Sequence, residues 1–286
     1  MLHRAGIALG QAYERKGKKL AFATFERSAG ADVAAAIDEG VRASILEREI
    51  TIVLQPQFNV LTGQLVGAEA LARLQHKDLG EIGAHQLFAA ADRTDLREEL
   101  SLLIQEQAIA IAAAWPPALN NLRLAINLGA QELDEGSAAR ILALLAQTGF
   151  EADRLTLELT EESLVRNIDL AGEQLEQLRA KAIRIALDDF GTGYSSLAYL
   201  KSLPLDYLKI DKSMTPDISG TGKDRIVLRA IIAMAKALGL QIIAEGVERK
   251  EELEMLRAEE CDFFQGYLRS PPLSAEEFER FAMLSN

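Results

Sequence analysis

Six short apolar runs in the last two-thirds of the sequence each end in a polar side chain suited to metal or phosphate chemistry. Short, nearly continuous apolar runs are typical of strands buried on both faces, as in a parallel sheet covered by helices. In a barrel of such strands the C-terminal strand ends converge on one mouth. We therefore predict one site there, built to hold divalent cations. The runs are residues 124–127, 155–158, 185–189, 207–209, 242–245 and 263–265.

The length and composition indicate how many domains the chain can form and argue against binding to nucleic-acid polymers. With 286 residues, of which 49% are hydrophobic, the chain can bury a large core. That length suits one barrel with a small appendage better than two equal domains. The net charge of −12 argues against binding to a nucleic-acid polymer, because such proteins are normally basic. A small anionic ligand remains compatible with this charge, since bound cations can reverse the local field.

The cysteines and histidines argue against thiolate and zinc sites, and the lengths of the apolar runs indicate where the protein resides. Cys261 is the only cysteine, so the chain can form neither an internal disulfide nor a thiolate metal site. The three histidines share no ligand-like spacing, which argues against zinc. No apolar run approaches the roughly 18–20 residues that span a bilayer, and no signal peptide is evident. We therefore expect a cytoplasmic protein, which would reach a membrane only through an upstream region.

The first 48 residues differ in pattern from the rest. Residues 2–13 have helical spacing of apolar side chains, and the basic stretch 15–19 is typical of a solvated turn. Residues 20–25 have a strand-like composition, and a loop at 28–30 should lead to a helix over 32–49. This region is predicted to form a small appendage that precedes the barrel.

From Ile50 onward the pattern indicates a barrel with an irregular start. Strands at about 51–59 and 64–74 are joined by a turn at 61–63, and so short a link joins only antiparallel strands. Helices and strands then alternate, which predicts right-handed crossovers and a parallel sheet. The expected fold is a modified (β/α)8 TIM barrel of the α/β class whose first strand is antiparallel. Helices are expected near 95–114, 137–147, 168–181, 222–239, 250–258 and 274–283.

Two adjacent aspartates end one of the strands. The side chains of Asp188 and Asp189 should diverge because of the strand pleat, so one can enter the mouth while the other reaches sideways. The segment 190–197 pairs Gly191 and Gly193 with hydroxyl side chains before a helix. It lacks the Gly-Lys-Ser/Thr of a phosphate-binding P-loop, so its glycines alone are weak evidence of phosphate binding.

These residues belong to a series of blocks that resembles the EAL-domain cyclic di-GMP phosphodiesterase family. The name-giving triplet stands as Glu69-Ala70-Leu71, and seven further family blocks follow in family order around it. The resemblance covers about residues 45–283 and implies a barrel with an antiparallel first strand. The blocks are Gln55-Pro56, Asn127-Leu128, Glu158-Leu159-Thr160-Glu161, the segment 188–197, Lys209-Ile210-Asp211, the segment 244–248 and Gln265-Gly266-Tyr267.

The resemblance implies hydrolysis of cyclic di-GMP to linear pGpG with two Mg²⁺ or Mn²⁺ ions. The implied ligands of the first ion are Glu69, Asn127, Glu158 and Asp188. Asp188 would bridge to a second ion, with Asp189 and Glu245 nearby. The chemistry suits these side chains, because two cations roughly 3.5–4 Å apart neutralise a phosphodiester and activate water. Oxygen ligands favour Mg²⁺ or Mn²⁺ over zinc or copper.

The resemblance also implies roles for residues around the cations. Lys209 would hold the attacking water or the phosphate, Gln265 would orient the water or its neighbours, and Glu248 would support Lys209 or the water network. Arg73 can fork onto a phosphate oxygen. The positions that match substrate contacts in the family are Gln55, Leu71 and Arg73.

Regulation is implied by the same resemblance. Glu161 matches the residue that anchors the loop after Asp188, a loop that includes Gly191, Gly193 and Ser195. In relatives this loop lies at a dimer contact, so a homodimer through the barrel domain is expected. The N-terminal residues resemble the end of a GGDEF domain, although no GGDEF motif is present. We divide the chain into a stub and linker helix, 1–44, and a phosphodiesterase domain, 45–286.

Two alternatives remain open at this stage. The chain departs from the family pattern at packing and outer-pocket positions such as Leu54, Leu74 and Ala84, which would suit a catalytically silent cyclic di-GMP receptor. None of these departures removes an implied metal ligand. Strand-end carboxylates alone would also allow a Mg²⁺-dependent barrel enzyme that abstracts a proton next to a carboxylate, with Lys209 as the base. The adjacent aspartate pair favours two cations over this second alternative.

Overall fold

A computed structural model describes residues 18–129, 132–160, 168–190, 200, 202–214 and 222–285. The chain divides into two compact units, each described by itself. One consists of Met1–Ile50 with Arg73–Leu100, and the other of Thr51–Ala72 with Ser101–Asn286. No helix within these described ranges is long and apolar enough to cross a membrane.

The larger unit is built on a closed barrel of eight strands. Neighbouring strands follow the order β1-β9-β8-β7-β6-β5-β4-β2, and a pairing between β1 and β2 closes the ring. All neighbouring pairs from β2 to β9 are parallel, whereas β1 runs antiparallel to β9. This confirms the predicted barrel with an antiparallel start. The strands are β1 (Thr51–Asn59), β2 (Leu65–His76), β4 (Arg123–Asn127), β5 (Leu155–Thr160), β6 (Arg184–Phe190), β7 (Tyr207–Ile210), β8 (Gln241–Ala244) and β9 (Phe263–Gln265).

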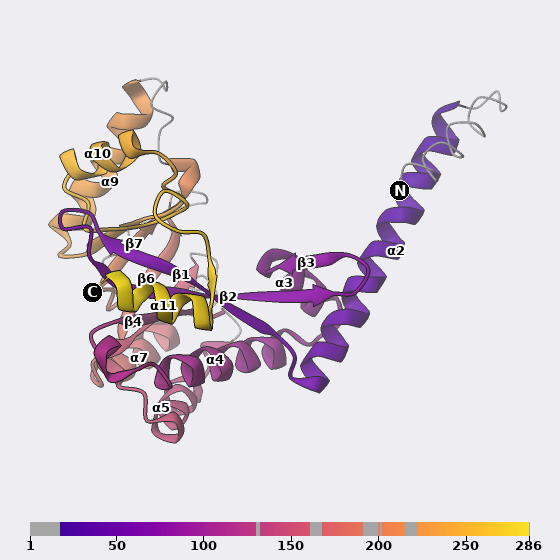
Figure 1. The fold of residues 1–286 in the computed structure, drawn as a ribbon, viewed down its shortest axis with the longest axis horizontal. Coiled ribbons are helices and arrows are strands. Elements are labelled where there is room, and N and C mark those ends of the chain that lie inside the picture. The colour runs from indigo at the N-terminus through magenta and orange to yellow at the C-terminus, as the bar shows by residue number, and fades with distance from the viewer. Residues whose placement is uncertain are drawn as a thin grey trace. The chain divides into compact units, whose positions relative to one another are not determined.

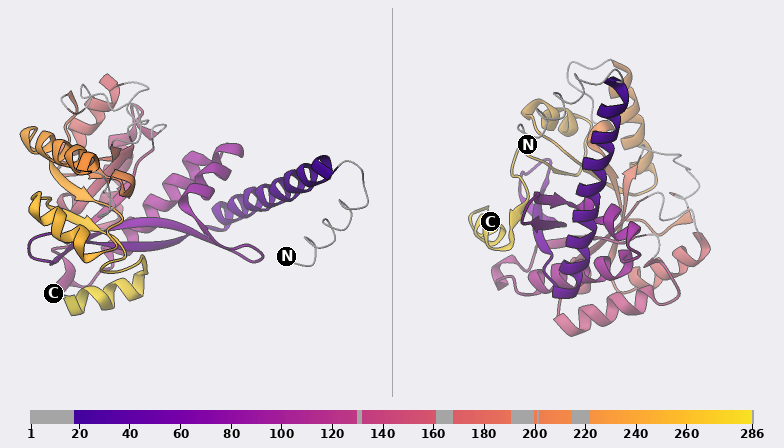
Figure 2. Two further views of the ribbon diagram at one scale, coloured as in Figure 1. Left: turned by 90° about the horizontal axis from the view of Figure 1, so that it is seen from above. Right: turned by 90° about the vertical axis from the view of Figure 1, so that its right-hand side faces the viewer.

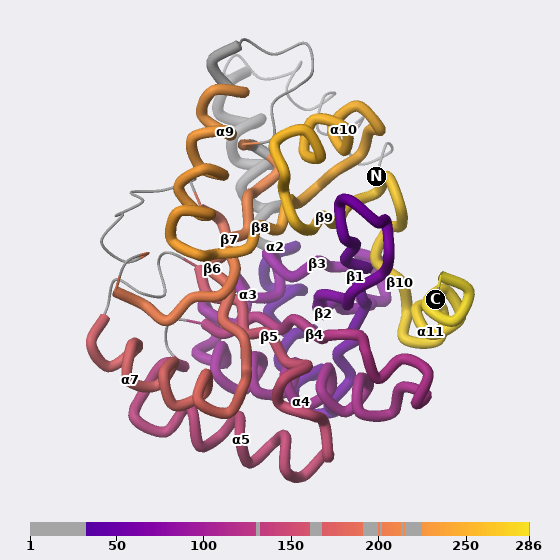
Figure 3. The backbone as a smooth tube through the Cα atoms, turned by 90° about the vertical axis from the view of Figure 1, so that its left-hand side faces the viewer, coloured from indigo at the N-terminus to yellow at the C-terminus, as the bar shows by residue number. Residues whose placement is uncertain are grey.

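Amphipathic helices cover the outside of this barrel (Figure 3). In α5 the buried Ala138, Ile141 and Leu145 recur at helical spacing, and Gly149 ends the helix in a left-handed conformation with φ 74°. Glycine is favoured there because it has no Cβ to clash. The helices of this unit are α5 (Ser137–Thr148), α7 (Ile168–Arg179), α9 (Gly222–Ala237), α10 (Lys250–Ala258) and α11 (Ala275–Ser285), and α4 (Arg97–Ala113) begins in the smaller unit.

A close approach between β2 and β4 explains why residue 67 is a glycine. A Cβ on Gly67 of β2 would lie 2.4 Å from the carbonyl oxygen of Arg123 on β4. Gly67 and Arg123 are paired in register, so no larger side chain fits without moving a strand. Because Glu69 lies two residues further along β2, this contact determines where Glu69 stands relative to β4.

Apolar side chains fill the barrel beneath the strand ends. Ala186, Tyr207, Ile243 and Phe263 form one buried cluster. The Arg123 guanidinium stacks on the rings of Tyr207 and Phe263, at 5.5 and 5.0 Å from their centroids. Each of these four cluster residues lies two positions before a polar residue at the strand end. The strand pleat therefore sends the polar side chains inward as well, one layer above this packed core.

The smaller unit contains a long helix, a hairpin and a short helix. Helix α2 (Lys18–Glu47) is continuous (Figures 1 and 2). The end of β2 pairs antiparallel with β3 (Gly80–Gly83), and α3 (Ala84–Arg93) follows. An ion pair joins Arg93 Nη2 of α3 to Asp38 Oδ1 of α2 at 2.6 Å.

Two expectations for this region are wrong. Residues 20–25 and 28–30, predicted as a strand and a loop, both lie within α2. A lone strand would leave its backbone groups without partners, whereas a helix pairs them within the segment, and the alanines of this stretch favour the helix. Helix α3 was not predicted, although Leu87, Ala90 and Ala91 are buried at helical spacing. The helix predicted at 2–13 lies outside the described residues.

Candidate metal and active site

Seven polar side chains gather at the C-terminal ends of the parallel strands. Each comes from a different strand or from the residue directly after it, because inward-facing positions alternate along every strand. The structure thereby brings together the side chains that the sequence pattern had picked out. They are Glu69 of β2, Asn127 of β4, Glu158 of β5, Asp188 of β6, Lys209 of β7, Glu245 after β8 and Gln265 of β9.

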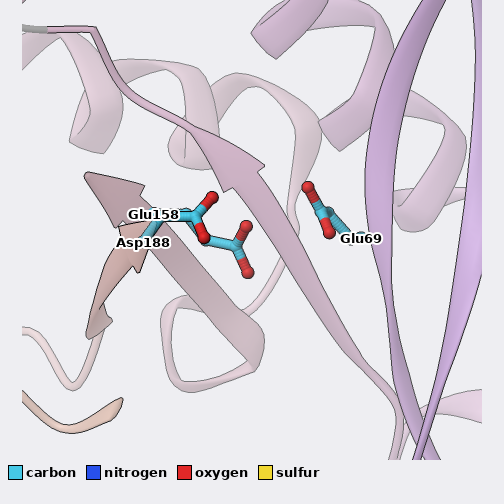
Figure 4. Close-up of side chains that lie close together, drawn as sticks. All are labelled: Glu69, Glu158 and Asp188. Atoms are coloured by element: carbon cyan, nitrogen blue, oxygen red, sulfur yellow. The ribbon is translucent and has the colours of Figure 1, made fainter. Parts of the chain in front are cut away.

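Three carboxylates form the centre of this site. Glu69, Glu158 and Asp188 each offer an oxygen, and these oxygens lie within 4.8 Å of one another. Figure 4 shows the three side chains pointing toward one another from separate strands. These side chains are 7%, 0% and 13% exposed, so water screens their mutual repulsion poorly. Such a cluster is stable only with protons or cations to compensate its charge.

Lys209 supplies part of that compensation. Its Nζ lies 2.5 Å from Glu158 Oε2, 2.8 Å from Glu245 Oε1 and 3.0 Å from Asp188 Oδ2. A fourth carboxylate, Glu69, lies 3.4 Å away. One fully buried ammonium therefore faces four carboxylates, and the group keeps an excess of acidic side chains.

The pKa values reflect this imbalance. Burial raises the pKa of Glu245 to about 8, against the attraction of Lys209. Burial and the charge of Glu69 raise the pKa of Glu158 well above its usual value. Burial acts the same way on Glu69, but Lys209 and hydrogen bonds from Gln265 and Asn127 outweigh it and lower its pKa. Burial disfavours the Lys209 ammonium, yet the carboxylates around it raise its pKa well above 10.5.

These residues fit divalent cations. Oxygen Oε1 of Glu158 is buried and has no hydrogen-bond partner among the described residues. A buried carboxylate oxygen without a donor is costly, and a hard cation would satisfy it. The oxygen-rich donor set and the surplus of carboxylates suit Mg²⁺, Mn²⁺ or Ca²⁺ rather than a thiophilic metal.

The two adjacent aspartates do diverge. The register between β6 and β7 shifts between Leu187 and Phe190, and Asp189 has a left-handed backbone with φ 56°. Asp188 faces Lys209, whereas Asp189 is exposed and donates its backbone N–H to Asp188 Oδ1 at 2.8 Å. Partial desolvation of the carboxyl by neighbouring atoms, together with the charge of Asp188, raises the pKa of Asp189. A strained non-glycine backbone at this point is typical of functional sites.

Amide side chains tie the carboxylates together. Gln265 Nε2 donates to Glu69 Oε2 at 2.6 Å and to Glu245 Oε1 at 3.1 Å. Asn127 Nδ2 lies 3.3 Å from the other oxygen of Glu69. Gln57 of β1, which the sequence analysis missed, donates to Gln265 Oε1 at 2.9 Å. Its position two residues after Gln55 on a buried strand is the signal that could have found it.

A second missed residue supports the turn that carries Asn127. The buried Glu132 accepts hydrogen bonds from Ser101 Oγ and the Gly129 backbone N–H, both at 2.6 Å, and from Gln105 Nε2 at 2.7 Å. Gln105 also donates to the Asn127 carbonyl at 3.3 Å. Burial raises the pKa of Glu132, against these three donors. No sequence motif pointed to this network, because its members are separated along the chain.

Other predicted site residues make different contacts. Glu248 is half-exposed and forms an ion pair with Lys212. Gln55 is buried and donates to the Ser270 carbonyl at 2.8 Å. Leu71 is half-buried.

The remaining predicted residues lie in the smaller unit or outside the described part of the chain. Arg73 belongs to the smaller unit, where its Nε lies 3.5 Å from Glu81 Oε1. The residues predicted for the regulatory loop are not among those described. They are Glu161, Gly191, Gly193 and Ser195.

Comparison with known proteins identifies the family. The family model described as "EAL domain" matches residues 38–272. A cyclic di-GMP phosphodiesterase of Pseudomonas aeruginosa is 36% identical over 82% of this chain, which spans 40% of that relative's length. A phosphodiesterase named PaMucR, solved as a c-di-GMP complex, has 32% identity and a TM-score of 0.79, covering 85% of this chain and 99% of that one.

A further similar structure is a complex with a metal ion. BlrP1 of Klebsiella pneumoniae, a calcium and cyclic di-GMP complex, is 28% identical with a TM-score of 0.70, over 79% of this chain and 56% of that one. The segment that the EAL domain model matches, residues 38–272, contains all three carboxylates of the cluster, Glu69, Glu158 and Asp188. The chain therefore belongs to the EAL domain cyclic di-GMP phosphodiesterase family.

Proposed function

We propose that this chain hydrolyses cyclic di-GMP to linear pGpG in a reaction that requires Mg²⁺ or Mn²⁺. The observation that carries the proposal is the buried group of four carboxylates around Lys209 at the mouth of an EAL-type barrel. Such an excess of buried acid is costly in a purely structural role and is suited to binding cations. The relatives named as phosphodiesterases support the choice of substrate.

Two sets of residues would hold the cations. Glu69, Asn127, Glu158 and Asp188 form the first set, in which the partnerless Oε1 of Glu158 is available as a ligand. Asp188 would be shared with a second set that includes Asp189 and Glu245. Bound divalent cations supply Lewis-acid chemistry, because they neutralise the phosphodiester charge and favour ionisation of the attacking water.

Lys209 and Gln265 contribute in different ways. Lys209 is a buried ammonium among four carboxylates, so it would act as a fixed positive charge toward the phosphate or the attacking water. Gln265 would keep Glu69 and Glu245 in place through its two donated hydrogen bonds.

Substrate contacts, assembly and location follow as parts of the same proposal. Gln55, Leu71 and Arg73 would contact the dinucleotide, with the Arg73 guanidinium on a phosphate oxygen. The loop anchored by Glu161 would couple a homodimer contact to the second cation. The proposed phosphodiesterase domain is 45–286, preceded by a stub and linker helix at 1–44, and the reaction would take place in the cytoplasm.

The direct test is incubation with cyclic di-GMP and either Mg²⁺ or Mn²⁺, with products separated by chromatography. We expect pGpG with either cation and none in the presence of excess EDTA. Glu69→Gln removes one buried charge at nearly constant volume and should lower turnover by about 10³-fold or more. Glu173→Gln, on the exposed face of α7, is the matched control and should retain full turnover. Tight binding of cyclic di-GMP without product under either cation would contradict the proposal and indicate a receptor.

A further inference from the structure

The antiparallel first strand brings a glutamine from outside the predicted set into contact with the site. Gln57 of β1 lies directly opposite Gln265 of β9 in the register of the two strands. Its Nε2 donates to Gln265 Oε1 at 2.9 Å. Both residues are 6% exposed, so water has little access to this hydrogen bond.

The carboxylates determine which way the Gln265 amide faces. Gln265 Nε2 donates to Glu69 Oε2 and to Glu245 Oε1, so its carbonyl oxygen points at β1. The partner on β1 must then be a donor, and Gln57 supplies one. Gln57 therefore donates a hydrogen bond to Gln265, and Gln265 in turn donates to the two carboxylates.

We propose that Gln57 is a positioning residue, which acts through Gln265 to hold Glu69 and Glu245 in the arrangement that binds divalent cations. The inference rests on the proposed function, since it concerns the same site. Without Gln57 the Gln265 carbonyl would be buried with no donor, and its amide could rotate away from the carboxylates. Residues that orient metal ligands typically change metal affinity by about 10–100-fold when they are removed.

Gln57→Met tests this role, because methionine has a similar length and volume but no donor. Gln174→Met is the matched control: Gln174 is 5% exposed on α7, and its amide oxygen accepts hydrogen bonds from Ser137 and Ala138 of α5. Four quantities are measured for each protein. They are the Kd for Mn²⁺ alone by isothermal titration calorimetry, kcat and KM for cyclic di-GMP, and the midpoint of thermal unfolding.

We expect Gln57→Met to weaken Mn²⁺ binding by about 10-fold or more and to lower kcat, with KM for cyclic di-GMP changed by less than about twofold. Gln174→Met should lose stability but keep the wild-type Kd for Mn²⁺. If Gln57→Met does not fold, Gln57→Asn replaces it. That variant keeps a polar amide, but its shorter side chain cannot reach Gln265 Oε1 at hydrogen-bonding distance, so it should weaken Mn²⁺ binding in the same way.

The remaining outcomes separate this inference from the proposed function. A wild-type Kd for Mn²⁺ in a folded Gln57 variant overturns the positioning role, as does an equal loss of Mn²⁺ affinity in Gln174→Met. If the wild-type protein binds Mn²⁺ without hydrolysing cyclic di-GMP, and the Gln57 variants bind it more weakly, then the positioning role stands and the proposed function fails. A wild-type protein that binds no Mn²⁺ overturns both.

Discussion

At the scale of single residues, Lys209 has the largest consequences. It is a fully buried ammonium that faces four carboxylates, and breaking a buried ion pair by removing one partner typically costs about 3–5 kcal/mol. Lys209→Met should therefore lower the unfolding temperature of the metal-free protein markedly. The loss should be smaller at acidic pH, where the carboxylates take up protons, and Mn²⁺ should restore part of it.

Differential scanning calorimetry in EDTA and in Mn²⁺ measures this effect. Lys212→Met is the matched control, because Lys212 forms an ion pair with Glu248 between two half-exposed side chains. Ion pairs in such positions contribute little to stability, so the control should unfold near the wild-type temperature. Equal unfolding temperatures for Lys209→Met and the wild-type protein would contradict the charge balance described for the site.

At the scale of elements, the approach of β2 to β4 determines the geometry of the cluster. Gly67→Ala would place a Cβ 2.4 Å from the Arg123 carbonyl oxygen, so one strand must move. Overpacking of this kind typically costs about 1–3 kcal/mol. Because Glu69 and Asn127 stand on these two strands, the substitution should also weaken Mn²⁺ binding.

Urea unfolding and Mn²⁺ titration together measure the two effects. Gly83→Ala is the control, since a Cβ at Gly83 would contact no atom within 4 Å and its φ of −82° is accessible to alanine. That variant should match the wild-type protein in both measurements. Wild-type stability and Mn²⁺ affinity in Gly67→Ala would show that the two strands can separate without consequence.

At the scale of the whole molecule, the buried acids should make stability depend on pH. Glu245 has a folded pKa of about 8 against a usual value of 4.5, and the pKa of Glu158 is also raised well above 4.5. The folded state therefore binds more protons than the unfolded state between these values. The contribution of Glu245 and Glu158 to the free energy of unfolding is fully present below about pH 4.5. It is lost as the pH rises toward 8.

The urea midpoint of the metal-free protein, compared at pH 6 and pH 8, measures this dependence. We expect a lower midpoint at pH 8, and Glu245→Gln should reduce the difference because it removes one of the titrating groups. Neither Glu69, whose pKa is lowered, nor Lys209, whose pKa is raised, changes protonation in this window. The same midpoint difference in Glu245→Gln and the wild-type protein would show that Glu245 does not titrate as described.

The barrel, its antiparallel first strand and the polar strand ends could all be predicted from the sequence. These features depend on local patterns: apolar runs of strand length, alternation with helices, and a turn too short for a parallel connection. Because strand ends converge in such a barrel, Glu158, Asp188 and Lys209 could be assigned to one site before any contact was known. Local composition failed where it was ambiguous, as at residues 20–25, which continue a helix.

Which of these side chains contact one another could not be predicted before the packing of the strands was known. Gln57 and Gln265 are 208 residues apart, and their hydrogen bond exists because β1 closes the barrel against β9 in one particular register. The contact of Glu248 with Lys212 is set by how the backbone folds after β7 and β8. The raised pKa of Glu245 depends on burial and on charges from other strands. Register, burial and long-range charge are properties of the packed molecule, so no local pattern encodes them.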